Sequence, residues 1–210
     1  MDNLKYQIPD RNGIHQSLHK LSKDSQDLDK NVKKDVVTKQ KTMTMDEFKK
    51  ALVSYGVNSS FDGDYLTLDM KHANVKNMLD NYKDYQFPVL NKLQITTSKS
   101  NSEATNKFFN NNFPSNVNRF YFYPNDGVEY KADLSVFIDS MLPKLKQVKD
   151  YFFILQCYLT KEHFANILEH SSHLDTLDFY ACFNDFDTCD IHKINYKIKN
   201  LYLSYFGHAS

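Results

Sequence analysis

The chain of 210 residues carries 26 lysines and arginines against 26 aspartates and glutamates, so its formal net charge at pH 7 is zero. This balance argues against a surface for nucleic acid or an anionic membrane, and no apolar run approaches the ~20 residues of a membrane-spanning helix. No apolar stretch follows the first charges as in a signal peptide. The chain has three cysteines, an odd number that does not suggest a framework of disulfides. We therefore expect an intracellular protein, cytoplasmic or nuclear.

Residues 1–43 are predicted to form a polar tail or a loosely ordered extension. Between Lys23 and Lys41, lysine alternates with Asp, Ser and Gln, which leaves too few large apolar side chains to offset the entropy lost on ordering. One pattern has the spacing of a weak amphipathic helix, at Ile14, Leu18, Leu21 and Leu28. It leaves two alternatives, a helix that docks on a partner or on the rest of the chain, and a solvated tail.

Residues 44–63 are predicted to hold a cap helix and a lead-in to the first strand. Thr44 and Glu47 have the spacing of a capping box. Apolar residues then recur with helical spacing and stop before Gly56, at Met45, Phe48, Leu52 and Tyr55. Because the first strand of a repeat array would otherwise be exposed, we expect a helix over about 44–56 to cap this end of the fold.

From residue 64 to the end, an apolar pair of the form L-x-L returns at intervals of about 24 to 32 residues. The six pairs are Leu66/Leu68, Leu93/Ile95, Phe120/Phe122, Phe152/Ile154, Leu177/Phe179 and Leu201/Leu203. Alternate residues of a strand point to the same side, so each pair predicts a short strand with one side in the core.

Helical stripes lie between several of the pairs. Apolar residues fall at i, i+3, i+4 and i+7 twice, in Val75, Met78, Leu79 and Tyr82 and in Leu134, Phe137, Ile138 and Met141. Thr160 is predicted to cap a third helix that buries Phe164, Ile167 and Leu168. The stretch 183–197 is poorer in helix formers, so we expect only a turn or two there. Alternating strands and helices predict an α/β fold with a parallel sheet.

The repeated unit is clearest in Leu174-Asp-Thr-Leu177-Asp-Phe179-Tyr-Ala-Cys182, and a second copy starts at Ile198 and has Phe206 in place of the cysteine. Earlier copies start at Leu90 and Val117. This pattern resembles leucine-rich repeat proteins of the ribonuclease-inhibitor-like, cysteine-containing type. The resemblance implies a horseshoe-shaped solenoid over 64–210, with a parallel sheet inside, helices outside and a role in protein binding.

One unit has two alternative frames. Its strand is either the segment that places Phe152 and Ile154 before Cys157, or a segment built on Leu145 and Val148. We prefer the Cys157 frame, because the residues before it have strong strand propensity and Cys157 lies one repeat length before Cys182.

The C-terminal end shows no polar covering helix after the last strand motif. An array without a cap exposes core side chains. We therefore expect either a fragment of a longer repeat array, which we favour, or a partner that covers this end.

A zinc site is the one metal hypothesis that the sequence raises, because Cys182, Cys189 and His192 form C-x6-C-x2-H and Cys157 is a conceivable fourth ligand. Zinc fingers use two tight ligand pairs, however, and two of these cysteines occupy interior repeat positions. We predict structural thiols, no metal and no cofactor. The remaining histidines noted, expected to be solvated, are His15, His19, His163, His170 and His173.

No motif of a known catalytic mechanism is present, so an enzyme is not expected. The acidic clusters are Asp62-Gly-Asp64 and Asp185, Asp187 and Asp190, and both lack the ligand spacing of an EF-hand loop. Turn formation explains them better.

The positive functional signal is the strand face that points away from the core. Its predicted residues are Tyr65, Thr67, Asp69, Lys92, Gln94, Thr96, Arg119, Tyr121, Tyr123, Tyr151, Phe153, Leu155, Thr176, Asp178, Tyr180, Asn200, Tyr202 and Ser204. Tyrosine and arginine are enriched in binding hot spots, although aromatic residues also favour strands for other reasons. The predicted partner-binding residues are Arg119, Tyr121, Tyr123, Tyr151, Phe153, Tyr180 and Tyr202.

Two functions stay open. We expect a non-catalytic protein-protein interaction scaffold that binds a protein partner on this face, with neither nucleic acid nor membrane as partner. The alternative is a structural subunit of a large multiprotein assembly. A scaffold is expected to be a soluble monomer with reversible binding, whereas a structural subunit is expected to aggregate when made alone.

Overall fold

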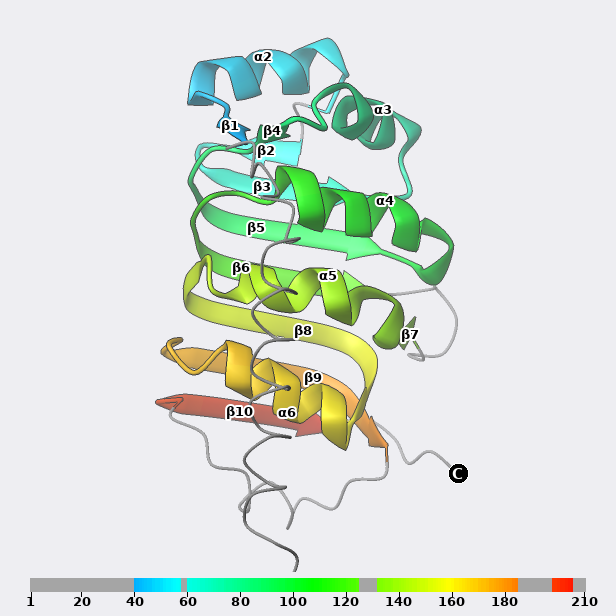
Figure 1. Ribbon diagram of the computed structural model, residues 1–210, viewed down its shortest axis with the longest axis vertical. Coiled ribbons are helices and arrows are strands. Elements are labelled where there is room, and N and C mark those ends of the chain that lie inside the picture. Colours follow the sequence, from blue (N-terminus) through cyan, green and yellow to red (C-terminus); the bar gives the residue numbers. More distant parts are fainter. Residues whose placement is uncertain (1–39, 58–59, 125–131, 185–197, 206–210) are drawn as a thin grey trace, which may run out of the picture. The chain divides into compact units, whose positions relative to one another are not determined.

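The computed structural model describes residues 40–57, 60–124, 132–184 and 198–205, all in the unit Gln40–Ser210 of the chain. These residues form an α/β fold in which helices α3 to α6 follow one another in the same order as the strands of a mostly parallel sheet (Figure 1). The predicted α/β class with a parallel sheet is confirmed.

The predicted tail, residues 1–43, lies outside the described residues except for its last four. Of these, Lys41–Thr42 forms β1, which pairs in parallel with β4 (Tyr85–Gln86), and Met43 is buried. Residues 41–43 therefore belong to the fold, whereas the prediction counted them with the tail. The possible helix that starts at Ile14 is outside the described residues.

Helix α2 (Met45–Ser54) has both of its ends determined by local sequence. At its start the Thr44 side chain accepts a hydrogen bond from the Glu47 amide at 3.2 Å, and the Glu47 carboxylate accepts one from the Thr44 amide at 2.8 Å. At its end Gly56 has φ 68°, and the amides of Gly56 and Val57 donate back to carbonyls of the last turn. This left-handed ending favours glycine. The predicted cap helix and its capping box are confirmed.

The main sheet has the strand order β10-β9-β8-β6-β5-β3-β2, with the two-residue strand β7 (Ala132–Asp133) paired to β8. Its strands are β2 (Phe61–Asp62), β3 (Tyr65–Asp69), β5 (Leu90–Thr97), β6 (Val117–Pro124), β8 (Val148–Thr160), β9 (Thr176–Asn184) and β10 (Asn200–Tyr205). All neighbours are parallel except β2 and β3, which form a hairpin at Gly63, where φ is 64°. The prediction of a turn at Asp62-Gly-Asp64 is correct.

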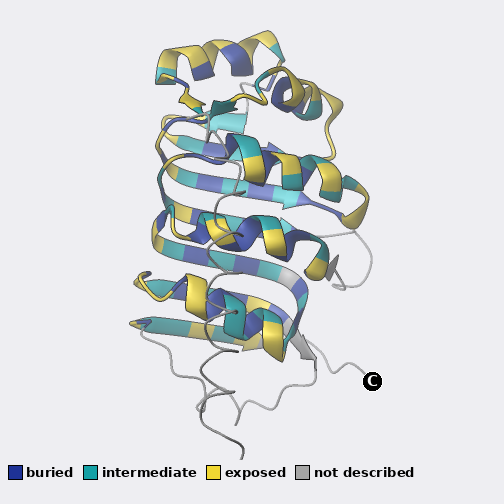
Figure 2. Ribbon diagram, viewed as in Figure 1, coloured by how far each residue is buried: buried dark blue, intermediate teal, exposed yellow. Residues whose placement is uncertain are grey.

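The six predicted apolar pairs lie side by side in this sheet. Strand pairing joins Leu66, Leu93, Phe120, Phe152, Leu177 and Leu201 in one row and their partners two residues later in the next. The first five pairs are buried, and the pair of β10 is half-buried. Figure 2 shows the resulting alternation of buried and half-buried positions along the strands.

The helices cover the buried side of the sheet. Helices α3 (Ala73–Asn81), α5 (Ser135–Leu145) and α6 (Lys161–His170) bury their predicted apolar stripes, except that Tyr82 follows α3 and is half-buried. Thr160 caps α6 by accepting from the His163 amide at 3.1 Å. Their buried side chains and the strand pairs form one hydrophobic core. The three predicted helices are confirmed.

A less regular connection follows β5. It consists of a 3-10 turn (Lys99–Asn101), α4 (Ser102–Lys107) and a π-helical turn (Phe108–Asn112) that buries two adjacent phenylalanines. The side chain of Asn112 is buried as well, and its Nδ2 donates to the carbonyls of Tyr82 and Tyr85 at 2.7 and 2.8 Å. One amide side chain thus holds the loop before β4 against the π-helical turn.

The preferred strand frame is correct, with one shift. Phe152 pairs with Leu177, while Leu145 is the last residue of α5 and not part of a strand. Beyond Leu155 the register between β8 and β9 shifts, so that Tyr158, and not Cys157, lies opposite Cys182. The expectation that the two cysteines occupy equivalent positions is therefore wrong, because an irregularity in β8 intervenes. Cys157 itself is buried, as predicted.

The prediction for 183–197 concerns residues that lie almost entirely outside the described part of the chain. Strand β10 is the last in the strand order of the described residues. No helix within the described ranges has both the length and the apolar character needed to cross a membrane.

Candidate functional site

The side of the sheet opposite the core is rich in aromatic and polar side chains, and we call it the aromatic face. Strand pairing arranges it in rows across the parallel strands. One row contains Tyr65, Lys92, Arg119, Tyr151, Thr176 and Asn200, and the next contains Thr67, Gln94, Tyr121, Phe153, Asp178 and Tyr202. Most of these side chains are half-buried, whereas Arg119 and Tyr202 are exposed. Each row therefore brings together residues that are about 24 to 32 positions apart in the sequence, on consecutive strands of the sheet.

The centre of this face is a continuous group of rings on β6 and β8, which we call the aromatic cluster: Tyr121, Tyr123, Tyr151 and Phe153. The ring centroid of Tyr121 lies 5.4 Å from that of Tyr151 and 5.9 Å from that of Phe153. Phe153 in turn lies 6.0 Å from Tyr123, nearly edge to face. These separations are in the range in which aromatic pairs attract one another. The rings therefore support each other and present a preformed surface.

Lys92 extends the cluster towards β3. Its ammonium nitrogen lies 4.2 Å from the ring centroid of Tyr65 and 4.4 Å from that of Tyr121. Both distances are typical of cation-π contacts. The sequence-based list of binding residues omitted Lys92 and Tyr65, because only the strand register shows that the lysine lies between two tyrosines. The sequence does contain one signal for this contact. A lysine lies beside one L-x-L pair, and tyrosines lie beside the L-x-L pairs before and after it.

Two hydrogen bonds between side chains link neighbouring strands on this face. The Tyr65 hydroxyl donates to Gln94 Oε1 at 2.8 Å, and the Tyr151 hydroxyl donates to Asp178 Oδ2, also at 2.8 Å. Burial, and then the bond to Asp178, raise the pKa of Tyr151 well above its usual value. Burial also raises the pKa of Tyr123, with smaller effects of Tyr65 and Tyr121. Both phenols keep their protons at neutral pH, so they are suited to donate hydrogen bonds and not to act as bases.

The structure places the seven predicted binding residues unequally. Tyr121, Tyr123, Tyr151 and Phe153 form the aromatic cluster, and Arg119 lies beside Lys92 and Tyr151 in the first row. Tyr180 and Tyr202 lie further along the sheet, on β9 and β10, where they are 37% and 56% exposed. The structure thus brings five of the seven together on two adjacent strands.

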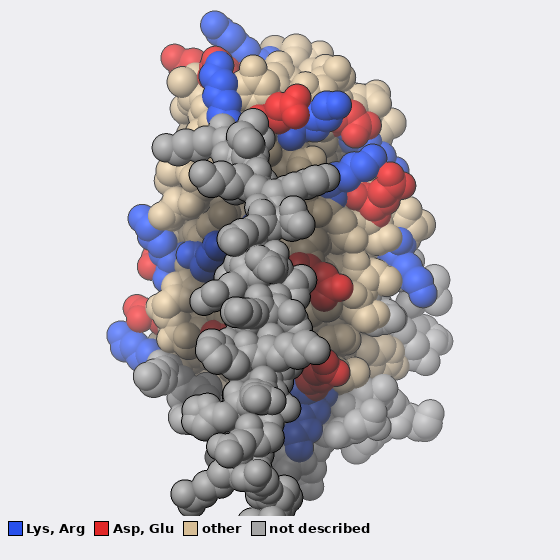
Figure 3. Space-filling view, in the orientation of Figure 1, with Lys and Arg blue, Asp and Glu red and all other residues tan. Residues whose placement is uncertain are grey.

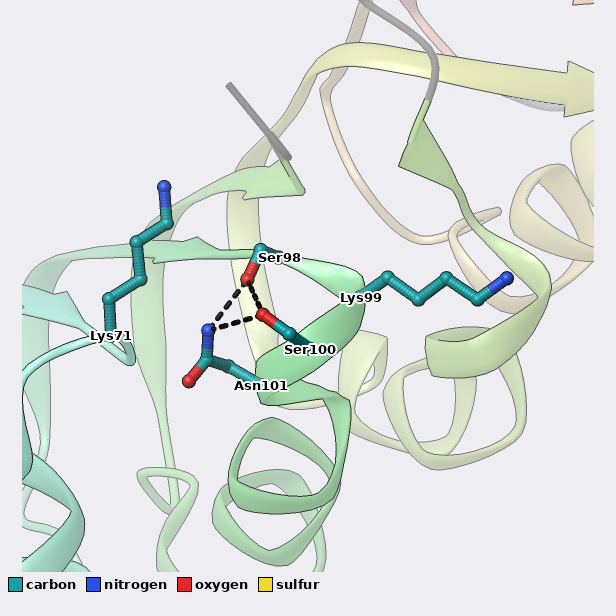
Figure 4. Close-up of a pocket in the computed structure, with 5 residues that line it drawn as sticks. All are labelled: Lys71, Ser98, Lys99, Ser100 and Asn101. Carbon is teal, nitrogen blue, oxygen red and sulfur yellow. Dashed lines mark hydrogen bonds between the residues drawn. The ribbon is translucent and has the colours of Figure 1, made fainter. Parts of the chain in front are cut away.

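A separate cavity of about 740 Å³ lies at the end of β5 and is lined by Lys71, Ser98, Lys99, Ser100 and Asn101 (Figure 4). Its polar groups are paired with one another, since Asn101 Nδ2 donates to Ser98 Oγ at 2.6 Å and the two serine hydroxyls are 2.9 Å apart. None of these residues is among the predicted binding residues. With its hydroxyls paired internally, this cavity is the weaker candidate for a site.

Figure 3 shows the charged side chains on one face of the molecule. On the face shown in Figure 3, acidic and basic side chains of the described residues are interspersed, without a large area of one sign. The visible part of this face therefore offers no extended basic patch for a polyanion.

The predicted absence of a zinc site stays a prediction, because Cys189, His192 and the side chain of Cys182 lie outside the described residues. In the part that the structure describes, no group of three or more His, Cys, Asp or Glu side chains is placed to hold a metal ion. His170 and His173 are exposed, as predicted, and His173 Nε2 lies 2.8 Å from the Val148 carbonyl oxygen. The prediction of a solvated side chain is wrong for His163, which is half-buried, with its Nδ1 buried.

Compared with models of protein families, with curated proteins and with solved structures, the chain gave no match.

Proposed function

We propose that this chain is a non-catalytic protein-interaction scaffold of the leucine-rich repeat type, which binds a protein partner on the aromatic face. What supports the repeat assignment is the alignment of the six apolar pairs in two rows across parallel strands. In a repeat protein, each unit buries its apolar side against its neighbours and leaves the other strand face for binding.

The observation that carries the binding proposal is the aromatic cluster. Its four rings contact one another while each remains half-buried, so a large apolar surface is already in position before a partner arrives. Tyrosine adds a hydroxyl to that surface, and rigid aromatic side chains lose little conformational entropy on binding. Such groups supply most of the binding energy at many protein interfaces.

The proposal includes no catalytic step. The polar atoms next to the cluster are engaged in strand-to-strand hydrogen bonds, in Tyr65 with Gln94 and in Tyr151 with Asp178. A phenol with a raised pKa is a poor general base at neutral pH. These features favour recognition over chemistry.

The experiment is capture of partners from the native source on the immobilised chain, identification by mass spectrometry, and measurement of the affinity of each purified partner by calorimetry. Replacing Tyr121 and Tyr151 together by alanine is expected to weaken binding by about 2 kcal/mol or more, which is about 30-fold. A control pair, Val53→Ala and Val89→Ala, removes exposed apolar side chains elsewhere and is expected to leave the affinity unchanged.

Unchanged affinity in a folded double tyrosine variant would reject the aromatic face as the binding site. Size-exclusion chromatography of the isolated chain distinguishes the alternative function, because a permanently assembled structural subunit is expected to aggregate when made alone.

A further inference from the structure

We infer that the aromatic face binds an extended peptide segment that carries an acidic side chain two residues away from an aromatic or large aliphatic one. This inference rests on the proposed function and specifies the chemistry of its partner. It comes from the two adjacent cations of the first row, Lys92 and Arg119.

Lys92 and Arg119 are paired across β5 and β6. Leu93 and Phe120, the next residue on each strand, are buried, so both cations project from the aromatic face. Neighbouring strands are about 4.8 Å apart, and like charges placed directly opposite each other repel. An anion bound between the two side chains would remove this repulsion.

No carboxylate of the described residues supplies that anion. Neither Lys92 nor Arg119 forms a salt bridge within the described ranges, in contrast to the surface pair Lys107–Glu103 at 3.0 Å. On either side of the two cations the row continues with tyrosines, Tyr65 and Tyr151. Among the described residues, these two positive charges therefore have no carboxylate within salt-bridge distance.

The Lys92 side chain is held in place although no carboxylate of the described residues pairs with it. Its ammonium group lies between the rings of Tyr65 and Tyr121, at 4.2 and 4.4 Å from their centroids, and the side chain is half-buried. Cation-π contacts leave the positive charge and its N–H donors available to an incoming group. Ordering before binding reduces the entropy that a partner has to offset.

The distance from the cations to the aromatic cluster determines the spacing in the partner. Tyr121 and Phe153 lie in the next row, two residues further along each strand, which is about 6.6 Å. Side chains i and i+2 of an extended peptide have this same spacing and point to the same side. A carboxylate of the peptide that reaches Lys92 and Arg119 thus places the side chain two residues away on the aromatic cluster.

The charge balance of the face favours a peptide over a nucleic acid. Its two cations, Lys92 and Arg119, are matched by two carboxylates, Asp69 and Asp178. Binding of single-stranded nucleic acid combines stacked aromatic rings with a groove that is positive along its length. On the aromatic face, the two carboxylates interrupt the positive charge that a nucleic acid would need. A peptide with one carboxylate next to an apolar side chain matches the charges of this face.

A random-peptide phage library selected on the immobilised full-length chain tests the inference. We expect enrichment of peptides in which Asp or Glu lies two positions from Phe, Tyr, Leu, Ile or Met. One enriched sequence, made as a fluorescein-labelled peptide, is expected to bind in fluorescence anisotropy with an affinity that falls as salt is added.

The matched variants are two double charge reversals. Lys92→Glu with Arg119→Glu is expected to weaken binding of this peptide at least about 10-fold. Lys71→Glu with Lys76→Glu makes the same change in net charge away from the aromatic face and is expected to have no effect. Circular dichroism and thermal unfolding of both variants establish that each is folded. If the first variant does not fold, Arg119→Glu alone takes its place, since that side chain is exposed.

Each other outcome overturns the inference. Enriched peptides without acidic residues, whose binding is lost in Tyr121→Ala with Tyr151→Ala, would reject the acidic partner and leave the proposed function standing. A selection without any enrichment rejects the peptide itself. A labelled single-stranded oligonucleotide that binds the wild type and loses affinity in the Lys92→Glu, Arg119→Glu variant would show that the cations serve a nucleic acid.

Discussion

The hydroxyl of Tyr151 on β8 donates a hydrogen bond of 2.8 Å to Oδ2 of Asp178 on the adjacent strand β9. The two residues are 27 positions apart in the sequence, and the bond exists only because the strands pair in one particular register. It holds one ring of the aromatic cluster in place and, together with burial, raises the pKa of Tyr151.

The first prediction concerns this titration. We expect the Tyr151 phenol to ionise well above the ordinary tyrosine pKa of 10.0. Because the raised pKa belongs to the folded state, the stabilisation is complete below pH 10 and is lost as the pH rises from 10 towards the folded pKa, since the unfolded chain ionises first. Absorbance titration at alkaline pH, as the difference between wild type and Tyr151→Phe, measures the effect.

Asp178→Asn is the companion variant for that titration. It removes the negative charge while an amide oxygen can still accept the hydrogen bond, so the pKa of Tyr151 is expected to fall towards its ordinary value without reaching it, because burial remains. An unshifted titration in this variant would mean that Asp178 has no electrostatic effect on the phenol.

The second prediction contrasts two residues that are neighbours in the chain. Phe120 is fully buried and stacks on Phe152 with centroids 5.3 Å apart, so Phe120→Ala is expected to reduce the free energy of unfolding by about 3 to 5 kcal/mol. Tyr121 lies on the aromatic face, where Tyr121→Ala removes only its contacts with two rings and Lys92, and is expected to cost less, about 1 to 2 kcal/mol. Chemical denaturation of both variants measures the difference, and equal losses would contradict the assignment of the two faces.

The third prediction concerns the capping box of α2. Thr44→Ala removes the acceptor of the Glu47 amide and is expected to destabilise the fold by about 1 kcal/mol. Thr44→Ser retains the hydroxyl and serves as the control, with a much smaller loss expected. Because the bonds to Thr44 lower the pKa of Glu47, the stabilisation by this carboxylate is expected to be present above the ordinary carboxyl pKa and to disappear as the pH falls through the lowered one.

The fourth prediction concerns the buried amide of Asn112. Asn112→Ala removes the side-chain donor to the carbonyls of Tyr82 and Tyr85, although the Tyr82 carbonyl still accepts from the Tyr85 amide, and is expected to cost about 1 to 3 kcal/mol. Asn112→Asp is expected to cost more at neutral pH, since a carboxylate would face two carbonyl oxygens, and to recover at acid pH when the carboxyl is protonated. Thermal unfolding measures both, with the exposed Asn110→Ala as the control. A neutral outcome for both Asn112 variants would show that the two bonds contribute nothing to stability.

Sequence alone determined the strand pairs, the helical stripes and the helix caps, but not the connection after β5, where Phe108 and Phe109 are buried. The L-x-L pairs, the apolar stripes of α3, α5 and α6, and the Thr44 and Thr160 caps depend on periodicities and hydrogen bonds within a few residues of the chain. The same reasoning predicted the residues of the aromatic cluster, because side chains beside a buried pair must point to the other side of the strand.

Only the tertiary structure decided how these pieces meet. The shift that places Tyr158 opposite Cys182, the bond from Tyr151 to Asp178 and the position of Lys92 between two tyrosines all depend on the register between strands that are far apart in the sequence. A shift by a single residue would turn different side chains towards each other, and no local pattern distinguishes these registers. The composition of the face follows from alternation along each strand, whereas its contacts follow from the pairing between strands.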